Sequence, residues 1–337
     1  MSEKLTVLVT GGAGYVGSIL VPKLLSKEYK VKVVDLYLFE KNLFSHCKLG
    51  DSLEEIQGDI RDQNLMKNAL KNVDVVIHLA CIANDPSYEL NPELGKSINY
   101  DALCDLVKIA KDSGVKRFVY ASSSSVYGIK EEENVTEEVS LEPLTDYSKY
   151  KALGEEFLFK NQSEEFATVA VRSATVCGYS PRQRLDLVVN ILTNLAVNTG
   201  SISVFGGEQK RPNIHIEDLT DLYTLLVEVE SSLISGQAFN VGAENHKVSE
   251  LAGLVQRNVG RDNVEIVQTP TDDNRSYHIC SDKIKNVIGF TTKRKIDNAI
   301  IELSDAIRTG LLVDTLNNRK YFNVKMVSEH MENLLKV

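Results

Sequence analysis

The feature that most constrains this chain is a β-branched run that leads directly into three evenly spaced glycines. Residues 6–17 read TVLVTGGAGYVG and are followed by an amphipathic, helix-like segment. Glycines at Gly11, Gly14 and Gly17 suit a tight turn, a close backbone approach to a pyrophosphate, and close packing of a helix on a strand. The N-terminus of that helix would present free N–H groups and a positive dipole end to phosphate oxygens. The segment therefore predicts a dinucleotide-binding strand, loop and helix.

An acidic residue at the end of the next expected strand supports this interpretation. Asp35 closes the run 31–35 and lies 18 residues after Gly17. A carboxylate at this place can accept hydrogen bonds from the adenosine ribose hydroxyls and repels a 2′-phosphate, which favours NAD over NADP. The alternative is a solvated carboxylate at a strand end.

Strand-like and helix-like segments alternate through the first half of the chain. The run VDVVIHLA is almost continuously apolar, as in a parallel strand that is covered on both faces. This alternation predicts βαβ units in a doubly wound parallel α/β sheet, the Rossmann type. The expected strands are 6–10, 31–35, 55–58, 73–80 and 116–122, and the expected helices are 15–27, 62–71, 95–113 and 146–160.

The pattern loosens after a further expected strand at 168–172. Helices are expected near 184–197 and 217–230, and a short apolar strand at 238–241 is expected to return to the large sheet. We therefore expect residues 1–175 to form an NAD-binding domain. Residues 176–337 are expected to form mainly a smaller α+β domain for the substrate.

The composition limits the classes of partner and the cell compartment. The 337 residues carry a net charge of −9, so no basic excess exists to displace counterions from nucleic acid. We find neither the apolar core of a signal peptide nor an apolar run of about 18 residues, and we expect a cytoplasmic protein without a membrane segment. The five cysteines never form C-x-x-C and the six histidines are dispersed, so reduced thiols and no metal site are expected.

A tyrosine and a lysine four residues apart suggest redox chemistry at an alcohol. Tyr147 and Lys151 lie on one face of the expected helix 146–160, whereas Tyr150 has no lysine at that spacing. The ammonium of Lys151, together with the positive nicotinamide of an oxidised cofactor, would lower the pKa of the Tyr147 phenol. Such a tyrosine can take the proton of an alcohol while hydride leaves the same carbon. The alternative is an exposed aromatic–lysine pair.

These residues together identify a family. The sequence resembles the extended short-chain dehydrogenase/reductase enzymes, and among them the nucleotide-sugar epimerase/dehydratase group. Besides the glycine loop and the Tyr147/Lys151 pair, the matching motifs are GDIRD (58–62), HLA (78–80), SINYDA around Asn99, SSSSVYG (122–128), RPNIHIED (211–218) and FNVG (239–242).

The resemblance implies NAD as the cofactor and a position for each part of it. It places Asp59 and Ile60 beside the adenine. It places the segment His78–Ala80, and in particular Leu79 and Ala80, along the pyrophosphate and ribose. Lys151 would also bond the nicotinamide ribose. Counted with the cofactor-binding set are Gly11, Gly14, Tyr15, Val16, Gly17, Asp35, Asn99 and Tyr147.

The resemblance also implies a nucleotide-diphosphate sugar as the substrate. Arg211 and Arg275 would form a clamp on its diphosphate, because guanidinium–phosphate pairs are strong and directional. Arg182 and Arg184 are weaker candidates, with ordinary surface charges as the alternative. Thr175 stands where many relatives have the Asn of R-x-x-N-x-Y-G, and Cys177 stands where they have Tyr.

The serine run at 122–125 selects among the reactions of the family. Four residues before Tyr127 the family carries a catalytic hydroxyl, here Ser123. The 4,6-dehydratases resemble T-D-E-V-Y-G and the decarboxylases T-S-E-V-Y-G, but this chain has Ser124 and Ser125 in the two following positions. Because eliminating water needs a general acid at the leaving group, the pattern favours a 4-epimerase, with Ser124 touching the substrate.

Other activities stay open at this point. A nucleotide-sugar C4 dehydrogenase or reductase would use the same Ser/Tyr/Lys set, and a 4,6-dehydratase or a non-catalytic NAD-binding regulator fits the pattern less well. The resemblance further implies a homodimer built on the helices near 95–113 and 146–160. Their apolar positions could equally face the core.

Overall fold

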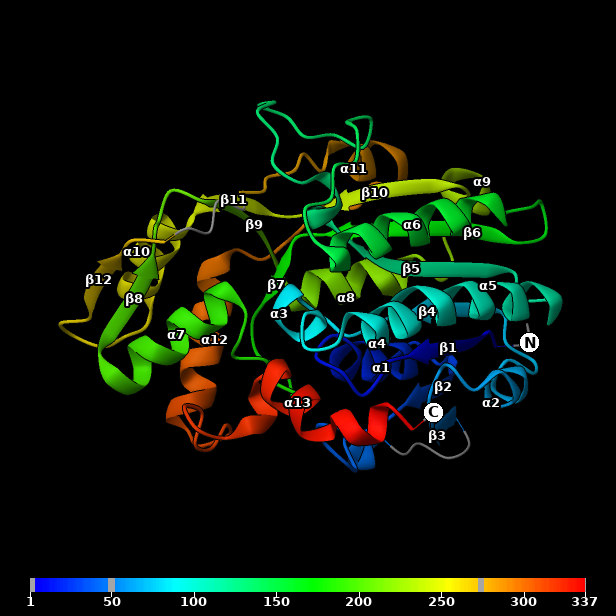
Figure 1. Ribbon diagram of the computed structural model, residues 1–337, viewed down its shortest axis with the longest axis horizontal. Coiled ribbons are helices and arrows are strands. Elements are labelled where there is room, and N and C mark those ends of the chain that lie inside the picture. The colour runs from blue at the N-terminus through cyan, green and yellow to red at the C-terminus, as the bar shows by residue number, and fades with distance from the viewer. Residues whose placement is uncertain (1–3, 48–51, 272–275, 337) are drawn as a thin grey trace.

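The structure, a computed structural model, describes residues 4–47, 52–271 and 276–336. Its centre is a seven-stranded sheet in the order β10-β6-β5-β4-β1-β2-β3, in which every pair is parallel. This confirms the doubly wound α/β sheet (Figure 1). The strands are β1 (Thr6–Thr10), β2 (Lys30–Asp35), β3 (Leu53–Gln57), β4 (Val75–His78), β5 (Arg117–Ser123), β6 (Ala167–Ser173) and β10 (Gln237–Val241).

Helices cover both faces of this sheet, which is why its central strands are apolar throughout. On one face pack α1 (Gly17–Ser26) and α8 (Ile216–Leu225), joined by the bond from Lys23 Nζ to Asp221 Oδ1 at 2.5 Å. On the other face pack α2 (Gln63–Ala69), α5 (Ala102–Asp112) and α6 (Asp146–Lys160). The sheet is therefore the middle layer of three, as the alternation of expected strands and helices predicts.

A second lobe lies beyond the carboxyl ends of the strands (Figure 1, left). Its core holds two small sheets with the orders β11-β9-β7 and β12-β8, packed with three helices. The elements are β7 (Thr175–Cys177), β8 (Ser201–Phe205), β9 (Lys210–His215), β11 (Glu244–Lys247), β12 (Glu265–Thr269), α7 (Val188–Thr199), α10 (Val248–Asn258) and α12 (Ile296–Arg308).

The chain passes back to the large sheet after it has entered this lobe. The returning strand is confirmed, since β10 pairs in parallel with β6. The C-terminal helix α13 (Asn323–Leu334) also returns, and Arg61 donates from Nη2 to the Leu334 carbonyl at 2.6 Å. The remaining elements are α3 (Asp85–Tyr88), α4 (Pro92–Lys96), a π turn (Ser97–Asp101), α9 (Ser231–Ile234), α11 (Asp282–Ile288) and 3-10 turns at Ser45–Cys47, Ser124–Tyr127 and Arg319–Tyr321.

Several expected boundaries differ from the observed ones. The helix expected at 95–113 is present, with α4, a π turn and α5 following one another without a gap from Pro92 to Asp112, and Asn99 of the π turn bonds the loop after β4. The helix expected at 184–197 begins only at Val188, because residues 182–187 form a loop that carries polar groups toward the centre of the molecule.

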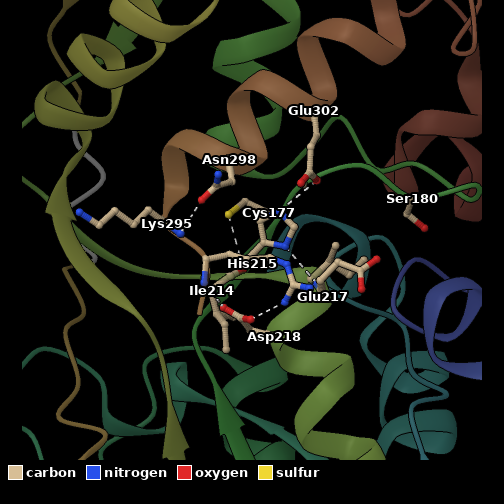
Figure 2. A network of polar contacts seen from close by, with 12 residues as sticks. Cys177, Ser180, Ile214, His215, Glu217, Asp218, Lys295, Asn298 and Glu302 are labelled. Carbon is tan, nitrogen blue, oxygen red and sulfur yellow. Dashed lines mark hydrogen bonds and ion pairs between the residues drawn. The ribbon is translucent and has the colours of Figure 1, made fainter. Parts of the chain in front are cut away.

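The RPNIHIED segment has a structural function at the junction of β9, α8 and α12 (Figure 2). His215 accepts a hydrogen bond at Nδ1 from the Glu217 amide (3.2 Å), and its Nε2 lies 3.1 Å from Glu302 Oε2. Asp218, which is buried, accepts from Arg294 Nη1 at 2.6 Å. These contacts cap α8 and anchor it to the second lobe. In the part of the chain that the structure describes, no helix has the length and apolarity required to cross a membrane.

Candidate active site

A cavity of about 540 Å³ opens at the carboxyl ends of the parallel strands. It lies where the strand order reverses between β1 and β4, the place at which doubly wound sheets bind ligands. It is lined by most of the residues that the sequence pointed to: Gly11, Gly14, Tyr15, Val16, Gly17, Asp35, Asp59, Ile60, Leu79, Ala80, Ser123, Ser124, Tyr147, Lys151, Thr175, Arg184 and Arg211.

Two positions of the glycine loop between β1 and α1 accept only glycine, because a side chain there would collide with the backbone. Gly11 has a φ of +72°, and a Cβ there would lie 2.6 Å from the backbone of Ala80. A Cβ on Gly17, the first residue of α1, would collide with the carbonyl oxygen of Gly12. The N-cap residue Val16 makes no side-chain cap, so the start of α1 faces the cavity as backbone. This geometry suits a pyrophosphate at a helix N-terminus.

Gly17→Ala is expected to lower both the melting temperature and the NAD content of the purified protein, because the added methyl group pushes α1 away from the loop. The matched control is Gly253→Ala in α10, where a Cβ would meet only the end of the Arg257 side chain at 3.3 Å. Alanine is the better helix former by about 1 kcal/mol, so the control should melt at the same temperature or higher. Thermal melts give the melting temperatures of both variants, and the absorbance of released NAD gives their NAD contents. Equal values in Gly17→Ala and Gly253→Ala would contradict the assignment of Gly17 to the cofactor-binding loop.

The carboxylate of Asp35 is fixed by backbone groups. Its Oδ2 accepts from the Ala13 amide at 2.9 Å and its Oδ1 from the Tyr37 amide at 2.8 Å. Burial raises the pKa of this carboxyl, and those two amides together with the positive Arg182 oppose the rise. The carboxylate lies at the end of β2 on the cavity wall and is half-buried.

Arg182 and Arg184 are not surface charges, and that alternative is wrong. Arg182 is 4% exposed and Arg184 is 9% exposed, and both line the cavity. Arg184 is paired with Asp186 through Nε at 2.9 Å and Nη2 at 3.2 Å. The loop 182–187 folds inward, which the sequence pattern of charges did not reveal.

The guanidinium of Arg182 is only partly satisfied. It stacks on the Phe39 ring, with Cζ 3.5 Å from the centroid, and donates from Nη2 to Asn323 Oδ1 at 2.6 Å. Its Nε and Nη1 are buried and have no hydrogen-bond partner among the described residues. Burial lowers the pKa of Arg182 to about 9. These two nitrogens carry three unsatisfied N–H groups near Asp35, which fit the oxygen-rich adenosine diphosphate half of NAD.

The expected catalytic residues meet at the end of β5. Ser123 is the last residue of β5, and Tyr147 and Lys151 lie one turn apart on α6. Lys151 is 3% exposed, donates from Nζ to the Ala121 carbonyl at 2.6 Å, and lies 5.8 Å from the centroid of the Tyr147 ring. Tyr150 instead stacks on Tyr88 at 6.2 Å, outside the cavity wall.

The electrostatics of Tyr147 differ from the expectation. Burial raises the pKa of its phenol, and Cys81 and Asp85 raise it further, while Arg184 lowers it. Lys151 donates a hydrogen bond to the Ala121 carbonyl, and lowering of the pKa of Tyr147 by this ammonium stays a prediction. Lowering of the pKa by a positive nicotinamide stays a prediction.

Two residues of the family motifs do not line the cavity. His78 does not line it: Thr10 Oγ1 lies 2.7 Å from His78 Nδ1 inside the sheet, and burial lowers the pKa of His78 to about 3. Asn99 does not line it either, but exchanges hydrogen bonds with the backbone of Ile82 at 2.8 and 3.0 Å. The loop after β4 is thereby shaped by Asn99 and can approach Gly11.

The expected two-arginine clamp is described only in part. Arg211 lines the cavity, with Cζ 5.5 Å from the centroid of the Tyr277 ring. Arg275 lies outside the described residues. Thr175, the first residue of β7, lines the cavity. It stands at the position where many members of the family that the sequence resembles carry Asn.

The sequence pattern missed two groups of cavity residues. Asp85 of α3 places a carboxylate near Ser125 and Tyr147, although the serine run itself has none. The C-terminal helix α13 contributes Asn323, Val327 and Leu334 on the side of Asp59. Neither group belongs to a motif. The only signal in the sequence is the turn-forming Asn84–Asp85–Pro86, which contains Asp85 itself.

Comparisons with known proteins agree with this geometry. A model of the NAD dependent epimerase/dehydratase family matches residues 7–242. The UDP-glucose 4-epimerase of Lactobacillus helveticus is 27% identical over 318 residues, covering 87% of this chain and 94% of that protein.

Solved structures are similar over nearly the whole chain. The UDP-glucose 4-epimerase of Thermotoga maritima with UDP-glucose has a TM-score of 0.81 and 25% identity, covering 91% of this chain and 100% of that one. MoeE5 in complex with UDP-glucuronic acid and NAD has a TM-score of 0.77 and 28% identity, covering 90% and 99%.

Proposed function

Because this chain belongs to the NAD-dependent epimerase/dehydratase family and is an NAD-dependent enzyme, we propose that it is a nucleotide-sugar 4-epimerase. The observation that carries the proposal is the meeting of Ser123, Tyr147 and Lys151 in one cavity, with serines at 124 and 125. The Lactobacillus helveticus and Thermotoga maritima relatives are named UDP-glucose 4-epimerases, which supports the same reaction.

Each part of the cavity would have a distinct function. NAD, when bound, supplies the acceptor and donor of hydride at C4. Gly11, Gly14 and the N-terminus of α1 would hold its pyrophosphate, while Asp35 and Arg182 would hold its adenosine side. Ser123 would bond the reacting oxygen, and Tyr147 would exchange the proton of the C4 hydroxyl.

The substrate side of the cavity is the second lobe. Arg211 would neutralise the diphosphate of the nucleotide sugar, and Thr175 would donate one hydrogen bond to the substrate. Arg184 is held by Asp186, so its guanidinium would orient rather than fully neutralise an anionic group. Residues of both lobes line the cavity, which would let one space hold the cofactor and the sugar together.

The experiment that tests the reaction is a product analysis. The purified protein is incubated with UDP-, GDP- and dTDP-hexoses and the sugars are resolved by NMR. We expect a C4 epimer without net NADH. Stoichiometric NADH with a 4-keto sugar would instead support the dehydrogenase/reductase alternative. A 4-keto-6-deoxy sugar would support a 4,6-dehydratase. No turnover with any of these sugars would favour the non-catalytic regulator.

Arg182→Met is expected to weaken binding of ADP-ribose by roughly 10- to 100-fold, the range for losing charge-assisted hydrogen bonds. Binding of UDP should stay unchanged, because Arg182 lies beside Asp35 and not in the second lobe's phosphate region. Isothermal titration of the NAD-stripped protein measures both affinities. The matched control is Arg308→Met at an exposed position, which should leave both unchanged. An unaltered ADP-ribose affinity in Arg182→Met would remove this residue from the cofactor site.

The homodimer is likewise a proposal. Of the helix positions that could face a partner, Leu103, Leu106, Val107 and Leu158 are fully buried within the single chain. A dimer would therefore use the half-buried Leu153 and Phe157 of α6. Light scattering on the purified protein measures its mass, and a mass of one chain would contradict the proposal.

A further inference from the structure

The C-terminal helix α13 crosses the cofactor end of the cavity, although it lies outside residues 7–242, which the family model matches. It leaves the second lobe and ends near the loop after β3 (Figure 1). Its residues Asn323, Val327 and Leu334 are buried and line the cavity. The helix therefore supplies one wall of the space that the adenosine half of NAD would fill.

The first turn of α13 is anchored by the buried guanidinium of Arg182. Arg182 donates from Nη2 to Asn323 Oδ1 at 2.6 Å, and the Asn323 amide donates to Asp186 Oδ2 at 3.0 Å. The segment just before the helix is held as well, since the Leu185 amide donates to the Tyr321 carbonyl at 2.9 Å. The loop that carries Arg182 therefore fixes the start of α13 against the cavity.

The last turn of α13 is anchored by Arg61, which follows β3. Arg61 donates from Nη2 to the Leu334 carbonyl at 2.6 Å. It also pairs with Asp59, through Nε at 3.0 Å and through Nη2 at 2.7 Å. Between the two anchors, Val327 packs in the same apolar cluster as Ile60. The helix is thus held at both ends across the pocket that would receive the adenine.

The side chain of Arg182 joins the helix to the region of the cofactor phosphates. Its Nη2 is used for Asn323, while its Nε and Nη1 are buried and have no partner among the described residues. These two nitrogens fit the adenosine diphosphate half of the cofactor. NAD that bonds them would fix the same guanidinium that holds α13. Bound NAD and the docked helix would therefore stabilise each other, because coupling between two sites is reciprocal.

We infer that α13 encloses the adenosine end of NAD, and that its anchor Asn323 sets how fast the cofactor enters and leaves. Asn323 is a positioning residue, since it acts through Arg182 and the helix. This enclosure rests on NAD as the cofactor and goes beyond the proposed 4-epimerase reaction. It suits that reaction, because a cofactor that is regenerated in every turnover has no need to leave. A dehydrogenase, in contrast, must exchange NADH for NAD after each reaction.

The test measures the exchange of radiolabelled NAD in the absence of sugar. Wild-type protein should keep its NAD through overnight dialysis. Asn323→Ala should raise both the association and the dissociation rate constant about tenfold, the effect of losing one hydrogen bond to a charged group. The dissociation constant should stay close to wild type, because α13 is loosened in the free and the bound protein alike. The matched control is Asn333→Ala, at an exposed position of the same helix, which should change none of these values.

A second pair of variants tests the other end of the helix. Leu334→Ala removes a buried side chain from the cavity wall, whereas Leu335→Ala removes one that is 54% exposed. Leu334→Ala should speed the release of NAD at least as much as Asn323→Ala does, because burial of a leucine side chain stabilises the docked helix by at least as much as one hydrogen bond. Leu335→Ala should exchange NAD as slowly as wild type.

Hydrogen exchange followed by mass spectrometry gives a readout that needs no variant. The amides of α13 should exchange more slowly in the NAD-loaded protein than in the NAD-stripped protein. The amides of α10, whose residues do not line the cavity, should exchange equally in both. Equal exchange of α13 in the two forms overturns the inference, and this comparison decides alone if Asn323→Ala does not fold.

The rate measurements can also overturn the inference. Unchanged exchange of NAD in Asn323→Ala would leave α13 a packing element only. A rise of the dissociation rate constant alone would make Asn323 an ordinary contact of the cofactor, and loss of NAD from wild type as fast as from Asn323→Ala would show that nothing encloses it. Because these assays contain no sugar, a wild type that exchanges NAD slowly but forms no C4 epimer overturns the proposed function alone.

Discussion

Tyr147→Phe is expected to lower kcat by about 10³-fold, within the range that positioned acid–base groups contribute. The change removes only the phenol oxygen of a residue that lines the cavity together with Ser123 and Lys151. The ring keeps its edge contact with Tyr88, whose centroid lies 6.5 Å away, so the fold around α6 is preserved. Because the glycine loop and Asp35 would bind the other end of the cofactor, the content of bound NAD should not change. Product analysis by NMR and absorbance of released NAD measure the two quantities.

The matched control for this prediction is Tyr150→Phe. Tyr150 lies on the same helix and stacks on Tyr88 at 6.2 Å and Tyr100 at 5.6 Å, but it does not line the cavity. Its kcat should stay close to wild type. If the two variants lose activity equally, or if Tyr147→Phe stays active, the assignment of the catalytic residue is wrong.

Glu155→Ala is expected to lower the free energy of unfolding by about 3–5 kcal/mol, the cost of breaking a buried ion pair by removing one partner. Glu155 is 2% exposed and accepts from Arg172 Nη2 at 2.7 Å, and Ser122 also donates to it. Arg172 is 6% exposed and would stay charged without its partner, bonded only through Nη1 to Tyr127 Oη at 2.7 Å. Urea unfolding followed by circular dichroism measures the change.

Two further variants separate the ion pair from general effects on α6. Glu156→Ala, at the next position, removes an exposed partner of Lys160 and should leave the unfolding midpoint nearly unchanged. The double variant Glu155→Leu/Arg172→Met replaces the pair by apolar side chains and should be more stable than Glu155→Ala alone. A double variant as unstable as the single one would show that the cost comes from packing and not from the unpaired charge.

The large sheet was predictable because its signals are local. The apolar run VDVVIHLA and the alternation of strand and helix periods reflect burial on both faces, and β1 and α6 begin and end where the sequence pattern predicts. The π turn inside the expected helix 95–113 was not predictable. Its residue Asn99 bonds the backbone of Ile82, a contact that a helical periodicity does not contain.

The candidate site was predictable where a motif spaces its residues along one element. Gly11, Gly14 and Gly17 share one loop, and Tyr147 and Lys151 share one helix face, so their relative positions follow from backbone geometry. Arg182 was interpreted as a weak candidate with a surface alternative. Its burial comes from Phe39 and from Asn323, which is 141 residues away in the chain.

The serine run shows the division most clearly. The sequence by itself determined that Ser123 ends a buried strand at the ligand-binding edge, and that positions 124 and 125 carry no carboxylate. Only the tertiary structure decided that a carboxylate from elsewhere in the chain lines the same cavity, since Asp85 of α3 accepts a hydrogen bond from Thr145 at the start of α6. The physical reason is that periodicity and capping act over a few residues, whereas hydrogen bonds between side chains depend on where packing brings distant elements together.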